Sequence, residues 1–137
     1  MKIITWNVNG IRSRIFNENI SSKLKKNELI FPQESSPIKK LIDDYDPDVI
    51  CLQETRCSVK NSERISIPGF KSFFNESKMS DARSADRYSG TVVFYRENMK
   101  VTEISTQIPE FEDAEGRIII ITFETFKCIT VYAPNSG

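Results

Sequence analysis

The clearest hydrophobic pattern in the chain has the spacing of a helix. Ile38, Leu41, Ile42 and Tyr45 follow one another at intervals of three and four residues, which places them on one helical face. Ser36 can accept a hydrogen bond from the first turn, and the proline that follows it suits that turn. We therefore expect a helix that begins after Ser36 and ends at the Asp-Pro pair following Tyr45.

Runs of aliphatic, β-branched and aromatic residues predict strands on both sides of this helix. They cover residues 3–8, 49–52, 70–74, 91–95, 101–108, 118–123 and 128–132. The order strand, helix, strand near the N-terminus favours a layered α/β arrangement, and the last two strands are typical of a hairpin. The polar residues between these segments are predicted as loops, with partial helix as an alternative over residues 12–34. No repeat or internal boundary interrupts what we expect to be one domain.

Charge and apolar content narrow the classes of partner. The chain has 19 basic residues (Lys and Arg) and 19 acidic residues (Asp and Glu), so its formal net charge is zero. A chain without net charge has no overall electrostatic attraction to nucleic acid or to a membrane. A nucleic-acid role would need a local basic surface. No apolar run has the length of a membrane span, and the first residues lead directly into a strand instead of forming a signal peptide. No membrane partner is expected.

The metal-binding and nucleophilic side chains exclude several chemistries. The three cysteines are an odd number without a CxxC pair, which is typical of free thiols in a reducing, intracellular compartment. The chain contains no histidine, which argues against a zinc site and excludes a Ser-His or Cys-His pair within it. Any metal is therefore expected to be a hard cation with oxygen ligands.

Polar side chains stand where predicted strands end. Glu54 follows the apolar run 49–52, and Asn7 and Asn9 point to one side if the first strand is extended there. If these strands are parallel neighbours, the three side chains converge and form a partial shell for Mg²⁺. The alternatives are a solvated strand end at Glu54 and an Asx-turn pair at the two asparagines.

The last predicted strand adds two more polar residues to the same rim. Tyr132 and Asn135 lie at its end. Tyr132 could donate a hydrogen bond to a phosphate oxygen, or it could be an ordinary half-buried strand tyrosine.

Five segments together carry a family resemblance. They read "WNVNGIRS", "DPDVICLQETR", "YSGTVVFY", "EGRIIIITF" and "VYAPNSG". In this order the chain resembles the exonuclease III class of apurinic/apyrimidinic endonucleases, within the endonuclease/exonuclease/phosphatase superfamily. The resemblance covers most of the chain except about residues 14–35, which we expect to be an insertion.

The resemblance implies a fold, an activity and a set of site residues. The implied fold is the N-terminal half of a two-sheet α/β sandwich of the DNase I-like/exonuclease III type. The implied activity is Mg²⁺-dependent cleavage of duplex DNA 5′ to abasic sites, with Mn²⁺ as an alternative ion and with 3′-5′ exonuclease or 3′-phosphodiesterase activity left open. By motif, the metal ligands are Glu54 and Asn9, the catalytic residues are Asn7, Tyr132 and Asn135, and the DNA-binding residues are Arg12, Arg56, Tyr88 and Arg117.

The family pattern also includes residues that this sequence lacks. The family's second half supplies an Asn-x-Asp element that orients the attacking water and a terminal Asp-His pair. We therefore expect this chain to be the N-terminal half of a nuclease that is monomeric at full length, inactive by itself, and nuclear or cytoplasmic according to the organism. The alternatives are a non-catalytic DNA-binding module and a relative that cleaves another phosphodiester or a phosphomonoester.

Overall fold

The computed structural model describes residues 1–17, 28–77, 89–111 and 115–133. Its elements are β1 (Ile3–Asn7), a π-helical turn η1 (Ile11–Ile15), α1 (Pro37–Tyr45), β2 (Val49–Gln53), α2 (Val59–Ser62), β3 (Phe70–Asn75), β4 (Thr91–Arg96), β5 (Val101–Ser105), β6 (Ile118–Phe123) and β7 (Lys127–Val131). Each predicted strand segment corresponds to one of these strands. The structure adds η1 and α2, which fall in segments predicted mainly as loops and are too short for a hydrophobic period to identify.

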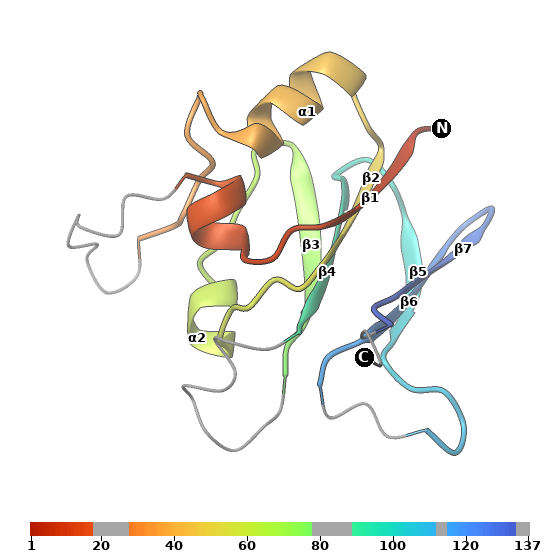
Figure 1. The fold of residues 1–137 in the computed structure, drawn as a ribbon. Helices are drawn as coiled ribbons and strands as arrows, with labels where there is room; N and C mark the ends of the chain where they lie inside the picture. The colour runs from red at the N-terminus through yellow and green to blue at the C-terminus, as the bar shows by residue number, and fades with distance from the viewer. Residues whose placement is uncertain (18–27, 78–88, 112–114, 134–137) are drawn as a thin grey trace.

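The strands form two separate sheets. The first sheet has the order β1-β2-β4-β3, and the second has the order β5-β6-β7. β1 and β2 run parallel, which confirms the condition for convergence at their carboxyl ends, and the remaining neighbours are antiparallel. Figure 1 shows the second sheet on one side of the first, with η1 and α2 on the other.

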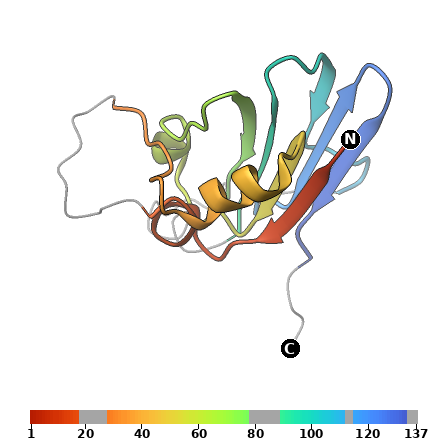
Figure 2. The ribbon, with the colours of Figure 1, turned by 90° about the horizontal axis from the view of Figure 1, so that it is seen from above.

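The alternation of side chains along the first sheet builds two apolar layers. One face of β2 and β4, which includes Ile50 and Phe94, packs with η1 and with α1 through Ile38. The opposite face, which includes Val49 and Val93, packs against β6 of the second sheet. Because both faces are covered, all five residues of β2 are buried. Figure 2 shows the resulting order of α1, first sheet and second sheet from above.

The predicted helix is present with the expected cap. Ser36 Oγ accepts a hydrogen bond from the Lys39 backbone N–H at 3.3 Å, and the helix ends at Tyr45. Ile38, the first residue of the predicted apolar face, is fully buried. Tyr45 departs from the prediction, because it is 59% exposed as the last residue of the helix.

The chain around the start of β6 joins the two sheets by hydrogen bonds to its backbone. Asn75 Nδ2 donates to the Ile118 carbonyl at 2.8 Å, and Thr91 Oγ1 donates to the Gly116 carbonyl at 3.1 Å. Gly116 has φ +66°, and a Cβ there would collide with the Asn75 backbone. The glycine of the "EGR" motif therefore has a structural reason that is independent of any DNA contact.

Within the described ranges, none of the helices has the length and apolar character needed to cross a membrane.

Candidate active site

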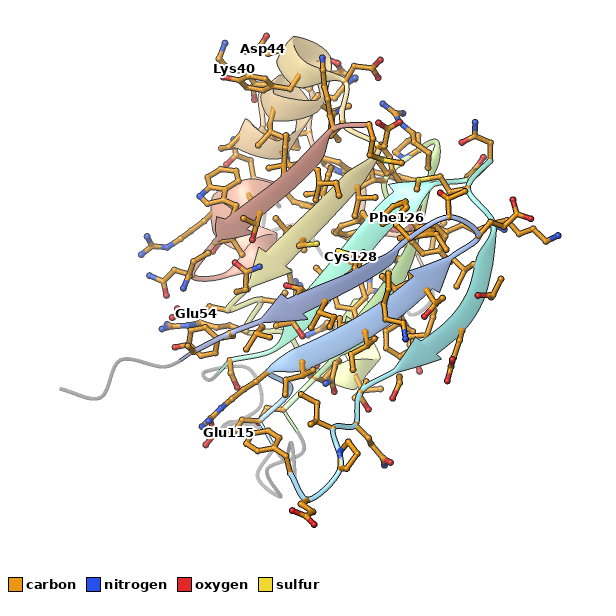
Figure 3. The ribbon with its side chains drawn as sticks, turned by 90° about the vertical axis from the view of Figure 1, so that its right-hand side faces the viewer. Lys40, Asp44, Glu54, Glu115, Phe126 and Cys128 are labelled. Carbon is orange, nitrogen blue, oxygen red and sulfur yellow. The ribbon has the colours of Figure 1, made fainter. Side chains whose placement is uncertain are left out.

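Glu54 is placed by the end of a fully buried strand. It follows Gln53, the last residue of β2, and its backbone turns sharply, with φ +55°. The Gly10 N–H donates to the Glu54 carbonyl at 2.8 Å, which fixes this turn against the segment after β1. The Glu54 side chain is 18% exposed, so it is more enclosed than a solvated strand end. Figure 3 shows Glu54 at the rim of the sheets, beside the outgoing end of β7.

Three side chains from different segments converge on the Glu54 carboxylate. Asn7 Nδ2, at the end of β1, donates to Oε1 at 3.2 Å. The Arg56 guanidinium lies 3.5 Å from Oε2. The Tyr132 hydroxyl, which follows β7, makes a further hydrogen bond with the carboxylate. The structure thus brings together residues that are up to 125 positions apart in the sequence, since Asn7 and Tyr132 both contact Glu54.

These contacts set the protonation states at the site. Burial alone would raise the pKa of Glu54, but the hydrogen bonds from Asn7 and Tyr132 and the charge of Arg56 lower it below its ordinary value. The hydrogen bond to the Glu54 carboxylate, together with burial, raises the pKa of Tyr132. At neutral pH the site therefore contains an anionic carboxylate next to a protonated phenol, which is a hydrogen-bond donor.

Arg117 lies close to this cluster but is committed to another partner. Its guanidinium forms an ion pair with Glu115, and its Nε donates to Glu115 Oε2 at 2.9 Å. The Arg117 carbonyl accepts the Tyr132 backbone N–H at 2.8 Å, so the two residues are neighbours across β6 and β7. The charge of Arg117 acts to lower the pKa of Tyr132, against the larger effect of Glu54. Arg117 is thus positioned at the rim.

A basic groove adjoins the carboxylate cluster. It has a volume of about 340 Å³ and is lined by Asn9, Gly10, Ile11, Arg12, Ser13, Arg14 and Arg56. Three of its lining side chains are arginines, and Arg56 also borders Glu54. Such a groove attracts anions even though the whole chain carries no net charge. This is the local basic surface that a nucleic-acid role requires.

Asn9 lines this groove. β1 ends at Asn7, and Asn9 has a left-handed backbone with φ +50°. The prediction that Asn7 and Asn9 point to one side assumed extended backbone through Asn9, and the backbone there is not extended. Their shared direction therefore stays a prediction. Asn9 Oδ1 is buried and has no hydrogen-bond donor among the described residues.

The structure therefore places only some of the predicted site residues together. Asn7, Glu54, Arg56 and Tyr132 form one cluster, with Arg117 at its border. Asn9 and Arg12 line the groove next to it. Tyr88 and Asn135, which were also predicted, lie outside the described residues.

Two polar residues of this region were missed by sequence reasoning. Arg14 lines the groove and is separated from Arg12 by one residue, an Arg-x-Arg spacing that could have indicated it. Gln53 is buried, and its Nε2 lies 2.9 Å from Thr5 Oγ1 and 3.2 Å from Thr130 Oγ1. A glutamine that ends a continuous apolar strand is the signal for such a buried link.

The oxygen donors at this rim are compatible with a hard cation that keeps most of its water. In the part of the chain that the structure describes, no three His, Cys, Asp or Glu side chains gather as a metal cage. Glu54 supplies one anionic oxygen, and Asn9 Oδ1 is a buried acceptor without a donor. One carboxylate with amide oxygens is compatible with Mg²⁺, which uses few protein ligands.

The sequence matches one protein family over nearly its whole length. The pattern described as "Endonuclease/Exonuclease/phosphatase family" covers residues 4–136. The exodeoxyribonuclease of Streptococcus pneumoniae is 27% identical over 143 aligned positions, which cover 100% of this chain and 48% of that protein. The zebrafish protein named DNA repair nuclease APEX1 is 31% identical, with 100% of this chain and 37% of that protein covered. The chain spans about half or less of the length of these curated relatives.

A solved structure has the same fold. The catalytic domain of Xenopus laevis APE2 superposes with a TM-score of 0.66 and 23% identity, covering 100% of this chain and 46% of that one. The architecture described above is accordingly that of the N-terminal part of a two-sheet, DNase I-like α/β sandwich.

Proposed function

The chain belongs to the endonuclease/exonuclease/phosphatase family, and on that premise we propose that it forms part of a DNA-repair nuclease that cleaves duplex DNA 5′ to abasic sites. The observation that carries this proposal is the enclosed Glu54 carboxylate, held by Asn7, Arg56 and Tyr132. The names of the bacterial and zebrafish relatives support a nuclease over a phosphatase.

The proposal includes a bound Mg²⁺. Glu54 would hold the ion, with Asn9 as the second candidate ligand, and the ion would neutralise charge on the phosphate and the leaving oxygen. Glu54 suits this role because its lowered pKa keeps it ionised at neutral pH. The Arg56 charge stabilises the same ionised form.

The other residues act on the DNA. Tyr132 stays protonated because its pKa is raised, so its hydroxyl would donate its single proton to a phosphate oxygen on which negative charge develops, in place of the Glu54 carboxylate. Asn7 orients the Glu54 carboxylate through its amide N–H. Arg12 and Arg56 line the basic groove and would hold the duplex backbone without reading its sequence. Arg117, Tyr88 and Asn135 remain predicted contributors to the same surface.

An incision assay on the full-length natural polypeptide tests this function. The substrate is a labelled duplex with one abasic-site analogue, in Mg²⁺ and in EDTA, beside the same duplex without the lesion. We expect Mg²⁺-dependent cutting at the lesion, and Glu54→Gln should lower kcat/KM by roughly 10²- to 10³-fold. DNA affinity of this variant, measured in EDTA, should change by only a few fold.

Glu97→Gln is the matched control for this substitution. Glu97 is exposed and follows β4, whose antiparallel pairing with β2 puts it at the opposite end of the sheet from Glu54. The incision activity of the Glu97→Gln variant should equal that of the wild-type protein. Binding without cutting by the wild-type protein would instead identify a non-catalytic DNA-binding module. Mg²⁺-dependent hydrolysis of phosphomonoesters, with no preference for the lesion, would point to another branch of the family.

A further inference from the structure

Two cysteines from different sheets face each other across the inner apolar layer. Cys51 lies in β2 of the first sheet, and Cys128 lies in β7 of the second. Their sulfur atoms are 4.0 Å apart, although the residues are separated by 77 positions in the chain. Figure 3 shows Cys128 on β7, on the strand that leads to the rim carrying Glu54.

The surroundings hold this pair in register. Gln53 lies two residues after Cys51 in β2, and Thr130 lies two residues after Cys128 in β7. Gln53 Nε2 donates to Thr130 Oγ1 at 3.2 Å, so a buried hydrogen bond also joins these two strands. Cys51 is only 3% exposed, whereas Cys128 is partly open to solvent. The pair thus has one protected sulfur and one that a small reagent can reach.

We propose that Cys51 and Cys128 form a redox-sensitive pair that a hydroperoxide oxidises to a reversible disulfide between the two sheets. A disulfide has a sulfur–sulfur bond of about 2.05 Å, so the two sulfurs must approach by roughly 2 Å. In the described structure β7 is an edge strand with one sheet neighbour, which leaves it room to move. A dithiol can reduce such a bond by thiol–disulfide exchange, so the link is reversible.

The two thiols have different roles in the reaction. The contact with the Cys51 sulfur lowers the pKa of the Cys128 thiol, although burial opposes this effect. The same contact, together with burial, raises the pKa of Cys51. Cys128 is therefore the sulfur that reacts first, because it has both the more acidic thiol and the greater exposure.

Peroxide would oxidise the pair in two steps. The Cys128 thiolate attacks the peroxide, the O–O bond breaks, an alcohol or water leaves with one proton, and Cys128 becomes a sulfenic acid. The Cys51 sulfur then attacks the Cys128 sulfur, the S–O bond breaks, and water leaves with the Cys51 proton. The two sulfurs together lose two electrons to the peroxide, and a dithiol reductant reverses the change.

The third cysteine provides a control within the same chain. Cys57 is 1% exposed and belongs to the other apolar layer, on the helix side of the first sheet. It is therefore separated from Cys51 and Cys128 by the sheet itself. Trypsin also separates the three thiols, because Cys51 falls in peptide 41–56, Cys57 in peptide 57–60, and Cys128 at the start of the peptide after Lys127.

The test uses the reduced full-length polypeptide at low concentration. The protein is treated with graded hydrogen peroxide, blocked with N-ethylmaleimide, digested with trypsin without reductant and analysed by mass spectrometry. We expect a cross-linked species that joins peptide 41–56 to the Cys128 peptide and is lighter than their sum by one hydrogen molecule. Dithiothreitol should restore both thiols, and neither should carry N-ethylmaleimide after full oxidation.

Three variants complete the experiment. Cys128→Ser and Cys51→Ala should each abolish the cross-link, and Cys57→Ala should leave its yield unchanged. Since Cys128 is only partly buried, Cys128→Ser tests the pair even if Cys51→Ala fails to fold. The proposal is overturned if peroxide consumes the thiols without joining Cys51 to Cys128, or if only links between separate molecules form. Because the readout is a mass, it does not depend on nuclease activity.

Discussion

The two sheets use apolar residues in different ways. In the first sheet, β2 is buried along its whole length and β4 over its first five residues, because helices cover one face and the second sheet covers the other. In the second sheet, β7 alternates, and its outward residues Ile129 and Val131 are 57% and 52% exposed. Glu54 is thus mounted on the better-packed sheet and Tyr132 on the more open one. The site depends on keeping these two supports in register.

The largest expected contrast is between a fully buried side chain of the first sheet and an exposed one of the second. Phe94 is fully buried and meets Phe74 edge-on, with ring centroids 5.9 Å apart. Phe94→Ala should lower the free energy of unfolding by about 3–5 kcal/mol, because it leaves a cavity. Ile129→Ala, on the exposed face, should change it by less than about 0.5 kcal/mol. Urea denaturation of the full-length polypeptide measures both, and a similar cost for the two variants would show that the outer face of β7 is covered in solution.

An intermediate effect is expected for the polar link between the sheets. Gln53→Ala removes hydrogen bonds from Nε2 to Thr5 and Thr130, so it should cost about 1–3 kcal/mol in unfolding free energy. The exposed residue Gln107 provides the matched control, and Gln107→Ala should be nearly neutral. Hydrogen exchange on the Gln53→Ala protein should show faster exchange in β7 than in β2. Equal acceleration in both strands would contradict a specific link between them.

The smallest expected effect is a pH dependence at the site. The pKa of Glu54 is lowered in the folded state from its ordinary value of 4.5, so the unfolded chain binds this proton more readily. The contribution of Glu54 to stability is therefore present above about pH 4.5 and is lost as the pH falls through the folded-state pKa. The melting temperature, measured at a series of pH values from 7 to 3, should fall more steeply for the wild type than for the Glu54→Gln variant. Parallel curves would mean that the Asn7 and Tyr132 contacts do not favour the charged carboxylate.

Sequence patterns could predict the parts of this molecule that depend on local periodicity. The apolar run before Glu54 and the helix after Ser36 were identified because burial imposes a repeat on them. The convergence of Asn7 with Glu54 also followed, since parallel strands bring their carboxyl ends together, and it is confirmed. The catalytic and metal-binding roles of these residues remain predictions.

Features that depend on how the two sheets stack could not be predicted. The partners of Gln53 and Cys51 lie on β7, 77 residues away in each case, and no periodicity relates such positions. The left-handed backbone at Asn9 was likewise not predicted, and strand alternation does not apply there because it holds only for extended backbone. Local pattern therefore identified the strands of the site, and tertiary packing decided which side chains meet there.

The backbone at the rim has a consequence for engineering this protein. Asn9, Glu54 and Arg56 all have positive φ values, a conformation that costs a residue other than glycine roughly 1–2 kcal/mol and is least unfavourable for asparagine. Glycine would relax the chain at Glu54 and Arg56, so a search for thermostable variants would tend to select it there. Each such gain would delete the carboxylate or the guanidinium on which the proposed chemistry depends. Heat resistance and activity are thus in direct competition at these positions, and stabilising changes are better made in the strands than at their ends.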